Sequence, residues 1–272
     1  MTNQNSKGTA LITGASGGIG AVYADRLAHR GYDLVLVARN GDRLSALAKR
    51  LAAATGRSVE TIAADLTDKA AIGKVEAVLR NDARLTMLVN NAGFGATAPL
   101  LQADMARMEE MIAINVGALT RLTYAAAPGF VARTNGTIIN IASMVAIAPE
   151  VLNGVYGGSK AFVLAFSQSL HHELSAKGVR VQAVLPGATE TEFWDIAGTK
   201  VAQLPPGIVM SAEHMVDAAL AGLDQGELVT IPSLPDIADW NKFEAARQTL
   251  MPNLSRAAPA DRYRLERDLA IA

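Results

Sequence analysis

The sequence contains no cysteine among its 272 residues. This absence excludes disulfide scaffolds, thiol nucleophiles, cysteine-ligated zinc and iron–sulfur clusters. An excess of charge of one sign is also missing, because 25 basic residues stand against 26 acidic ones and the formal net charge is −1. Proteins that bind nucleic acid through phosphate contacts normally carry a basic excess, so that class of function is disfavoured.

Long uninterrupted hydrophobic runs are missing as well. The most apolar long stretch, 116–132, is broken by Arg121, Pro128 and Gly129, so we expect no membrane span. The first seven residues are polar and lack the apolar segment of a signal peptide, which predicts a cytoplasmic protein. Half of the residues are hydrophobic and 19% are charged, a composition that favours a folded core over disorder.

Short β-branched and leucine-rich runs alternate with longer alanine-rich helical patterns. The expected strands are 10–13, 34–38, 59–63, 87–90, 137–141, 179–185 and 228–231. The expected helices between them are 19–30, 41–55, 69–82, 105–132, 156–177 and 212–224. This alternation predicts an α/β fold with a parallel sheet covered by helices on both faces.

The same pattern predicts a single domain over residues 1–272, with a core of about 8–231 and a helical extension of about 235–272. The extension carries two helical patterns, about 237–250 and 260–269. Trp240, Phe243 and Leu250 lie at near-helical spacing in the first of them. We expect that helix to dock on the body of the protein or on a partner subunit.

A glycine-rich loop joins the first expected strand to the first expected helix. Glycines allow a tight turn and a close approach of the backbone to a pyrophosphate, and the helix N-terminus offers free N–H groups to the phosphates. An ordinary glycine-rich turn and a methyl-donor or other nucleotide site are the alternatives, but the position after strand one favours a dinucleotide. The expected contacts are Gly14, Ser16, Gly17, Gly18, Ile19 and Gly20.

Arg39 stands at the end of the second expected strand, and no acidic residue follows until Asp42. A carboxylate at this place binds the ribose 2′-hydroxyl of NAD, whereas an arginine pairs with the 2′-phosphate of NADP. The sequence therefore predicts that NADP(H) is preferred over NAD(H). The alternatives are that Arg39 is only a solvated loop cation, or that Asp42 folds back over the ribose.

Tyr156 and Lys160 lie four residues apart in a helical pattern, and therefore on one helix face. A cation held near a phenol in a partly dry cleft lowers the phenol pKa, so the pair can supply an acid–base group. Ser143 follows the expected strand 137–141, at the carboxyl end where ligands bind in open α/β sheets. Each residue alone has a plainer interpretation, a chance spacing for the pair and a cap for the serine.

Together these residues resemble the short-chain dehydrogenase/reductase family over about residues 8–231. The order and spacing of the motifs agree with the family pattern. They are Thr13–Gly20, Asp65, Asn90-Asn91-Ala92-Gly93, Asn115, Ser143, Tyr156, Lys160 and Pro186-Gly187. The resemblance implies a single Rossmann-type domain with a doubly wound, seven-stranded parallel sheet.

The resemblance also implies roles for four catalytic residues. The residue matching Tyr156 passes a proton to or from the reacting oxygen, and the one matching Ser143 holds that oxygen. The residue matching Lys160 binds the nicotinamide ribose and lowers the pKa of the tyrosine. The residue matching Asn115 holds a water that links the lysine to solvent; without the resemblance, Asn115 is a satisfied polar residue in a core.

Further cofactor contacts are implied by the same resemblance. Asp65 and Leu66 resemble the adenine contact, and the Asn90–Gly93 segment resembles the support of the sheet centre beside the adenine ribose. The remaining expected contacts are Asn91, Ala92, Gly93, Tyr156, Lys160, Pro186, Gly187, Thr189 and Thr191.

Apolar residues after Pro186-Gly187 predict a lid over a hydrophobic carbonyl or alcohol substrate. In the lid they are Phe193, Trp194, Ile196, Val201, Leu204 and Met210, and the facing residues are Phe94, Met144, Val145, Val151, Leu152 and Asn153. Packing in the core or at a subunit contact is the alternative for each.

The sequence predicts an NADP(H)-dependent oxidoreductase that interconverts a hydrophobic ketone or aldehyde and its alcohol. The alternatives are a cofactor-binding sensor or scaffold on the same fold and a methyltransferase, neither of which needs a tuned phenol. Adjacent His171 and His172 point to different helix faces, so we expect no metal. Helices 105–132 and 156–177 are apolar on more than one face, which predicts a homodimer or homotetramer.

Overall fold

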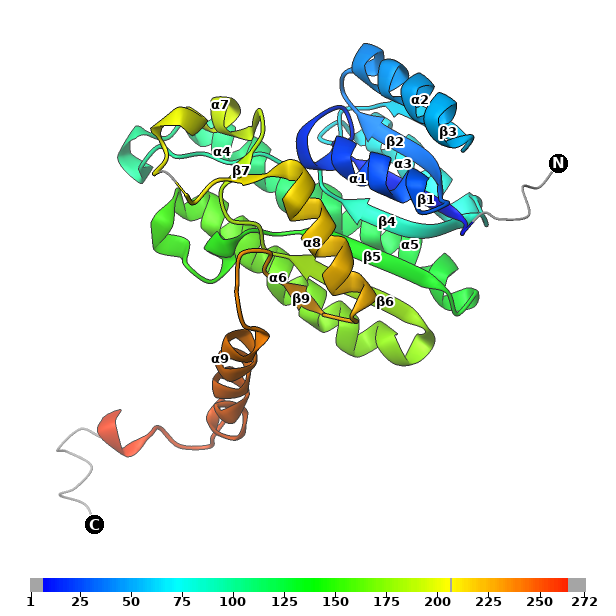
Figure 1. Ribbon diagram of the computed structural model, residues 1–272. Coiled ribbons are helices and arrows are strands. Elements are labelled where there is room, and N and C mark those ends of the chain that lie inside the picture. The colour runs from blue at the N-terminus through cyan, green and yellow to red at the C-terminus, as the bar shows by residue number, and fades with distance from the viewer. Residues whose placement is uncertain (1–6, 206, 264–272) are drawn as a thin grey trace. The chain divides into compact units, whose positions relative to one another are not determined.

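The computed structural model describes residues 7–205 and 207–263 and places seven strands in one sheet. The strand order is β3-β2-β1-β4-β5-β6-β9, and every neighbouring pair is parallel (Figure 1). The strands are β1 Thr9–Thr13, β2 Asp33–Ala38, β3 Val59–Ala63, β4 Leu85–Asn90, β5 Gly136–Ile141, β6 Val179–Val184 and β9 Val229–Thr230. The predicted parallel sheet is confirmed. Because strand order reverses between β1 and β4, a crevice for ligands is expected at the carboxyl ends of these strands.

Helices connect the strands much as the periodicity predicted. The helices are α1 Gly18–His29, α2 Gly41–Thr55, α3 Lys69–Asn81, α4 Met105–Ile112, α5 Leu119–Ala132, α6 Gly154–Leu174, α7 Phe193–Ala197, α8 Ala212–Asp224 and α9 Ile237–Thr249. Local capping fixes several starts: the Asn40 side chain accepts from the Arg43 N–H, and the Asp68 side chain accepts from the Ala71 N–H. No described helix is long and apolar enough to cross a bilayer.

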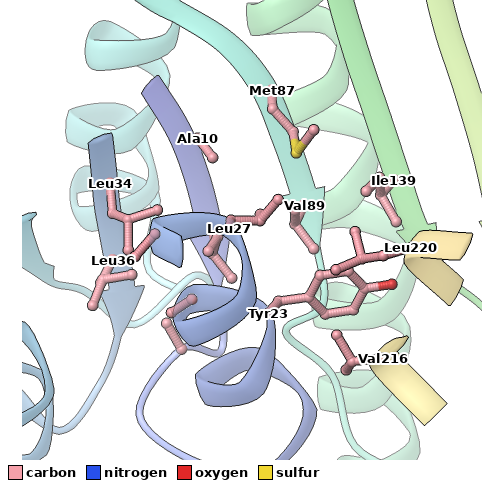
Figure 2. Close-up of a cluster of buried hydrophobic side chains, with 14 of the residues drawn as sticks. Ala10, Tyr23, Leu27, Leu34, Leu36, Met87, Val89, Ile139, Val216 and Leu220 are labelled. Atoms are coloured by element: carbon pink, nitrogen blue, oxygen red, sulfur yellow. The ribbon is translucent and has the colours of Figure 1, made fainter. Parts of the chain in front are cut away.

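Successive strand residues point to opposite faces and build two separate cores. Ala10 and Ile12 of β1 pack with residues of α1, α2 and α8, as Figure 2 shows for Tyr23, Leu27 and Leu220. The intervening residue, Leu11, packs on the other face with residues of α3, α5 and α6. Burial of a large aliphatic side chain contributes about 1.5–3 kcal/mol, so both faces stabilise the sheet. The two-sided burial explains why the strands read as continuous apolar runs.

The expected single helix 105–132 is interrupted, which corrects the prediction. The chain forms α4, then a π-helical segment over Ala113–Ala118, then α5. Asn115 lies inside the π segment with its side chain buried. A π-bulge inserts an extra residue into the helical turn and is found mostly at functional positions.

The segment after β6 is more ordered than the expected loop. It contains the short helix α7, a 3₁₀ turn over Val201–Gln203, and a parallel pair formed by β7 Thr189–Glu190 and β8 Met210–Ser211. These elements are too short to produce a periodic pattern in the sequence.

Packing divides the chain into two compact units, Met1–Pro232 and Ser233–Ala272. In the second unit, α9 places the Trp240 and Phe243 rings 5.4 Å apart. The expected docking of this helix stays a prediction. Of the second expected helix, 260–269, the structure describes only a 3₁₀ turn at Asp261–Tyr263, and the remainder lies outside the described residues.

Candidate active site

The glycine loop is fitted tightly against the turn that follows β4. The Asn91 side-chain amide donates to the carbonyl oxygens of Thr13 and Gly14 at 3.0 and 3.3 Å. A Cβ on Gly20 would collide with the Gly14 carbonyl, and Gly14 itself has a φ of +65°. Glycine is therefore required at both positions. The side chain of Asn91, expected to contact the cofactor, holds the loop in place.

The outer side of this loop has room for a phosphate group. Gly17 precedes α1 in extended conformation without a side-chain cap, so the first helical N–H groups are not taken by a capping side chain. A Cβ on Gly17 would meet its nearest neighbours only at 3.9 Å, and these are the charged ends of Arg43 and Glu192. The residues present fit the pyrophosphate of a dinucleotide.

Arg39 lies exposed just beyond the end of β2, and the described residues place no carboxylate within ion-pair distance of it. Asp42 belongs to the first turn of α2, where a carboxylate is favoured by the helix dipole. Asp42 is therefore held in the helix. The sequence-based concern that it folds back over the ribose has no support in this arrangement.

Asp65 follows β3 and accepts hydrogen bonds from the Thr67 N–H and hydroxyl at 2.9 and 2.7 Å. These two bonds hold the pKa of the Asp65 carboxyl below its usual range, and Arg39 adds a smaller effect in the same direction. Leu66, the other expected adenine contact, is buried. The carboxylate is thus ionised and faces the region where Arg39 lies.

Ser143, Tyr156 and Lys160 are brought together at the carboxyl end of β5, and all three are buried. Asn153 caps α6 by accepting from the Val155 and Tyr156 N–H groups, which places Tyr156 in the first helical turn. Lys160 lies one turn further, and its ammonium donates to the Ile141 carbonyl at 2.8 Å. The predicted set occupies one place in the fold.

Burial dominates the acid–base properties of this group. It raises the pKa of the Tyr156 phenol to about 12, and the hydrogen bond with Ser143 offsets part of that rise. It also lowers the pKa of the Lys160 ammonium to about 8. The expectation that Lys160 lowers the phenol pKa is not met by the protein alone, because desolvation outweighs any effect of a cation that bonds the Ile141 carbonyl.

Asn115 connects the π segment to two other parts of the site. Its side-chain oxygen accepts from the Phe94 N–H at 3.1 Å, and its amide donates to the Phe94 carbonyl and the Ser159 hydroxyl at 2.9 and 3.0 Å. A Cβ on Gly93 would lie 2.5 Å from the Asn115 side-chain oxygen and 3.9 Å from the Lys160 nitrogen. The Asn115 side chain thus fixes the turn after β4 beside Lys160. Its oxygen and its amide group both form hydrogen bonds with other groups of the protein.

The Pro186–Thr191 segment crosses beside this group. The Pro186 carbonyl accepts from the Met144 N–H at 2.9 Å, and the Thr189 carbonyl accepts from the Trp194 indole at 2.9 Å. A Cβ on Gly18 would lie 3.1 Å from the Thr191 methyl group. The segment therefore joins the Ser143 region to the start of α1.

Apolar side chains pack around Tyr156 and form an apolar wall beside its ring. Phe193 packs against the Tyr156 ring with centroids 5.7 Å apart. The wall includes the expected residues Phe94, Met144, Val145 and Leu152, together with Met108, Met111 and Ala96, which sequence reasoning missed. In the sequence, the three-residue spacing of Met108 and Met111 already indicates that both lie on one face of α4.

Several residues expected beside the substrate are not part of this apolar cluster, and one of them, Met210, packs against the core that contains residues of α1 and α8. Asn153 is the α6 cap and also donates to the Ala98 carbonyl at 2.7 Å, so its polar groups are occupied. Ile196 and Val151 are half exposed. His171 and His172 join no group of three or more possible metal ligands among the described residues.

Comparisons with known proteins agree with this geometry. Residues 8–201 match the family model described as short chain dehydrogenase. A short-chain dehydrogenase from Sphingobium yanoikuyae in complex with NADPH is 52% identical, with a TM-score of 0.92, and the match covers 94% of this chain and all of that one.

Two further relatives are informative. A bulky-bulky ketone specific alcohol dehydrogenase from Comamonas testosteroni is 44% identical, with a TM-score of 0.86, over 94% of this chain and 98% of that one. A serine 3-dehydrogenase from Agrobacterium fabrum is 38% identical over 188 residues, which is 68% of this chain and 74% of that relative.

Proposed function

The chain belongs to the short-chain dehydrogenase/reductase family of oxidoreductases, and we propose that it interconverts bulky, apolar ketones and their secondary alcohols with NADP(H) as the preferred cofactor. The observation that carries the proposal is the buried Ser143–Tyr156–Lys160 group beneath an apolar wall. A binding module would gain nothing from burying a phenol and an ammonium together, since burying a charged group is costly.

In the proposed reaction the bound nicotinamide supplies or accepts a hydride. Tyr156 exchanges the proton with the substrate oxygen, and Ser143, its hydrogen-bond partner, orients that oxygen. Burial raises the pKa of the phenol to about 12 in the protein alone, so Tyr156 is protonated near neutral pH and holds the proton that reduction of a carbonyl consumes. The Lys160 ammonium donates one hydrogen bond to the Ile141 carbonyl, and its other N–H groups remain to bind the ribose.

The apolar wall supports a hydrophobic substrate. Phe94, Met108, Met111 and Val145 offer no charge to bind a carboxylate or phosphate on the substrate. Arg107 lies 3.8 Å over the Phe94 ring and also pairs with Glu110 at 2.6 Å, so this nearby cation is neutralised. The substrate class named for the Comamonas testosteroni relative agrees with an apolar wall of this kind.

The proposed preference for NADP(H) rests on two observations: Arg39 is exposed with no carboxylate of the described residues within ion-pair distance, and Asp42 is held in α2. The relative from Sphingobium yanoikuyae, described in complex with NADPH, supports it.

Oxidation of NADPH in the presence of ketones graded in size and polarity tests the function. The proposal fails if no ketone in the panel is reduced.

Replacement of Tyr156 by phenylalanine tests the proton transfer. The ring retains its packing against Phe193, while the donor is lost, so kcat falls by about 10²–10⁴-fold. Because the volume is preserved, we expect the Kd of NADPH, measured by fluorescence titration, to change less than about threefold. A loss of kcat below tenfold contradicts the role assigned to Tyr156. Lys160→Ala is the companion variant and loses both turnover and cofactor affinity.

A further inference from the structure

Phe193 covers the one ring that the substrate has to reach. Tyr156 is only 5% exposed, and Phe193 of α7 packs on it at 5.7 Å with an angle of 46° between the rings. Phe193 also packs with Trp194, with ring centroids 5.5 Å apart and an angle of 86° between the rings. An aryl group that packs against the Tyr156 ring at this place therefore has to displace Phe193.

Gly95 leaves the space that Phe193 fills. A Cβ on Gly95 would overlap Cζ of Phe193 and would lie 3.3 Å from Cε2 of Tyr156, a carbon next to the one that carries the hydroxyl. Gly95 is buried and its φ is not in the left-handed region, so the backbone does not require glycine there. The absence of a side chain at 95 creates a slot beside the reactive end of Tyr156.

The other side chains packed around Tyr156 are apolar as well. Val145 and Met111 belong to the same packed cluster as Tyr156 and are almost fully buried, at 1% and 0% exposure. Both belong to elements packed into the core, a 3₁₀ turn directly after β5 and helix α4. Phe193 instead belongs to a five-residue helix whose neighbours Glu192 and Ile196 are exposed. Of the side chains around Tyr156, Phe193 is thus the one whose displacement loses the fewest packing contacts.

The α7 segment is attached at its far end by polar contacts. The Ala197 carbonyl accepts from the Thr97 N–H and hydroxyl at 3.1 and 2.9 Å. These bonds leave the ring of Phe193 as the part of α7 that reaches the phenol, while the backbone stays tied to the turn after β4. A change of side-chain rotamer alone then uncovers Tyr156.

We propose that the slot between Gly95 and Tyr156 receives a ring of the substrate, that Phe193 occupies it as a placeholder, and that this pair determines selectivity for aryl ketones. The inference rests on the proposed function and names its substrate class. A space vacated by a phenyl group accepts an apolar ring of the same size, because such a cavity stays dry and regains its contacts when filled. Displacement of Phe193 reduces the apparent affinity of the wild-type protein for such a ring.

Kinetics with acetophenone and 2-butanone test this proposal. Phe193→Ala frees the slot, so we expect the KM for acetophenone to fall about tenfold, while the KM for 2-butanone changes less than about threefold. Ile196→Ala, on the exposed side of the same helix, is the matched control and leaves both KM values unchanged. A higher KM for acetophenone, or an equal change for both ketones, overturns the proposal.

The double variant Gly95→Ala/Phe193→Ala distinguishes two roles for Gly95. Gly95 either leaves a slot for the substrate or only makes room for the Phe193 ring. The added methyl group narrows the slot, so acetophenone loses the gain made in Phe193→Ala and 2-butanone is unaffected. If Gly95 serves only to avoid a clash with Phe193, the double variant behaves like Phe193→Ala with both ketones, and the proposal is wrong.

A binding measurement keeps this test independent of turnover. In thermal unfolding without cofactor, acetophenone raises the Tm of Phe193→Ala more than that of the wild type, and the gain is lost in the double variant. If no ketone is reduced but this pattern holds, the proposed function fails and the slot stands. If ketones are reduced without this pattern, the slot fails and the proposed function stands.

Discussion

The guanidinium of Arg43 and the carboxylate of Glu192 lie 2.8 Å apart, although 149 residues separate them in the sequence. Arg43 belongs to the first turn of α2, and Glu192 immediately precedes α7. Both charged groups lie 3.9 Å from the position that a Cβ on Gly17 would take. The ion pair therefore bridges the α2 side and the α7 side of the phosphate-binding loop, and it holds the pKa of Glu192 below its usual range.

Glu192 places a negative charge beside the proposed pyrophosphate site, so its removal is expected to favour the cofactor. For Glu192→Gln we predict a Kd for NADPH lowered by about three- to tenfold at low salt, a gain that added salt reduces through screening. Calorimetric titration at two ionic strengths measures it. Glu190→Gln removes another exposed carboxylate of the same segment and serves as the control. Weaker NADPH binding in Glu192→Gln contradicts the repulsion and shows that the pair retains the cofactor.

Arg39 is the residue predicted to select NADP(H). A bidentate, charge-assisted contact with the 2′-phosphate corresponds to a preference of about ten- to a hundredfold in kcat/KM over NAD(H). Arg39→Asp is expected to raise the KM for NADPH strongly and the KM for NADH little. Lys49→Asp makes the same charge change on the exposed side of α2 and controls for net charge. Unchanged NADPH kinetics in Arg39→Asp would show that another group selects the cofactor.

The buried ammonium of Lys160 is expected to lower the free energy of unfolding, although the proposed reaction needs it. Its pKa is lowered by burial to about 8, below the ordinary value of 10.5. The unfolded chain therefore binds more protons between about pH 8 and pH 10.5, and stability rises with pH across that window. Below pH 8 the full cost of burying the charge is present, about 3 kcal/mol from a shift of this size.

The variant Lys160→Met retains the apolar stem and removes that charge. We predict a free energy of unfolding about 1–2 kcal/mol higher than the wild type at pH 7, since about 1 kcal/mol is lost with the bond to the Ile141 carbonyl. Urea unfolding at pH 7 and pH 10 measures the difference, which should shrink at the higher pH. Lys177→Met, at an exposed lysine, is the control. A variant less stable than the wild type at pH 7 contradicts this account.

An aromatic cluster on α5 and α6 supports the predicted homo-oligomer. Tyr124, which is 70% exposed, stacks on Phe166 at 6.5 Å, and Phe162 stacks on Phe166 at 5.5 Å. Large exposed aromatic groups of this kind are typical of subunit contacts. We predict that Tyr124→Asp shifts the mass measured by light scattering toward the monomer, whereas Leu101→Asp, at another exposed apolar residue, does not. A monomeric wild type at micromolar concentration refutes the prediction.

The three residues Ser143, Tyr156 and Lys160 come together as the sequence predicted because their positions depend on local geometry. Tyr156 and Lys160 share a face through helical periodicity, and Ser143 follows a strand whose apolar run is unmistakable. The helical pattern around Asn115 gave no sign of a π segment. That feature depends on bonds from Asn115 to Phe94 and Ser159, which lie 21 and 44 residues away.

The sequence alone determined the parallel sheet, the glycine loop and the residues available for acid–base chemistry. Each of these follows from alternation, helical period or a conformation that only glycine adopts easily, and all three are local properties. Only the tertiary structure decided that Lys160 bonds the Ile141 carbonyl, and that Phe193 covers Tyr156 above Gly95. These contacts join segments distant in the chain, and the burial that sets the pKa of Tyr156 exists only after those segments have packed.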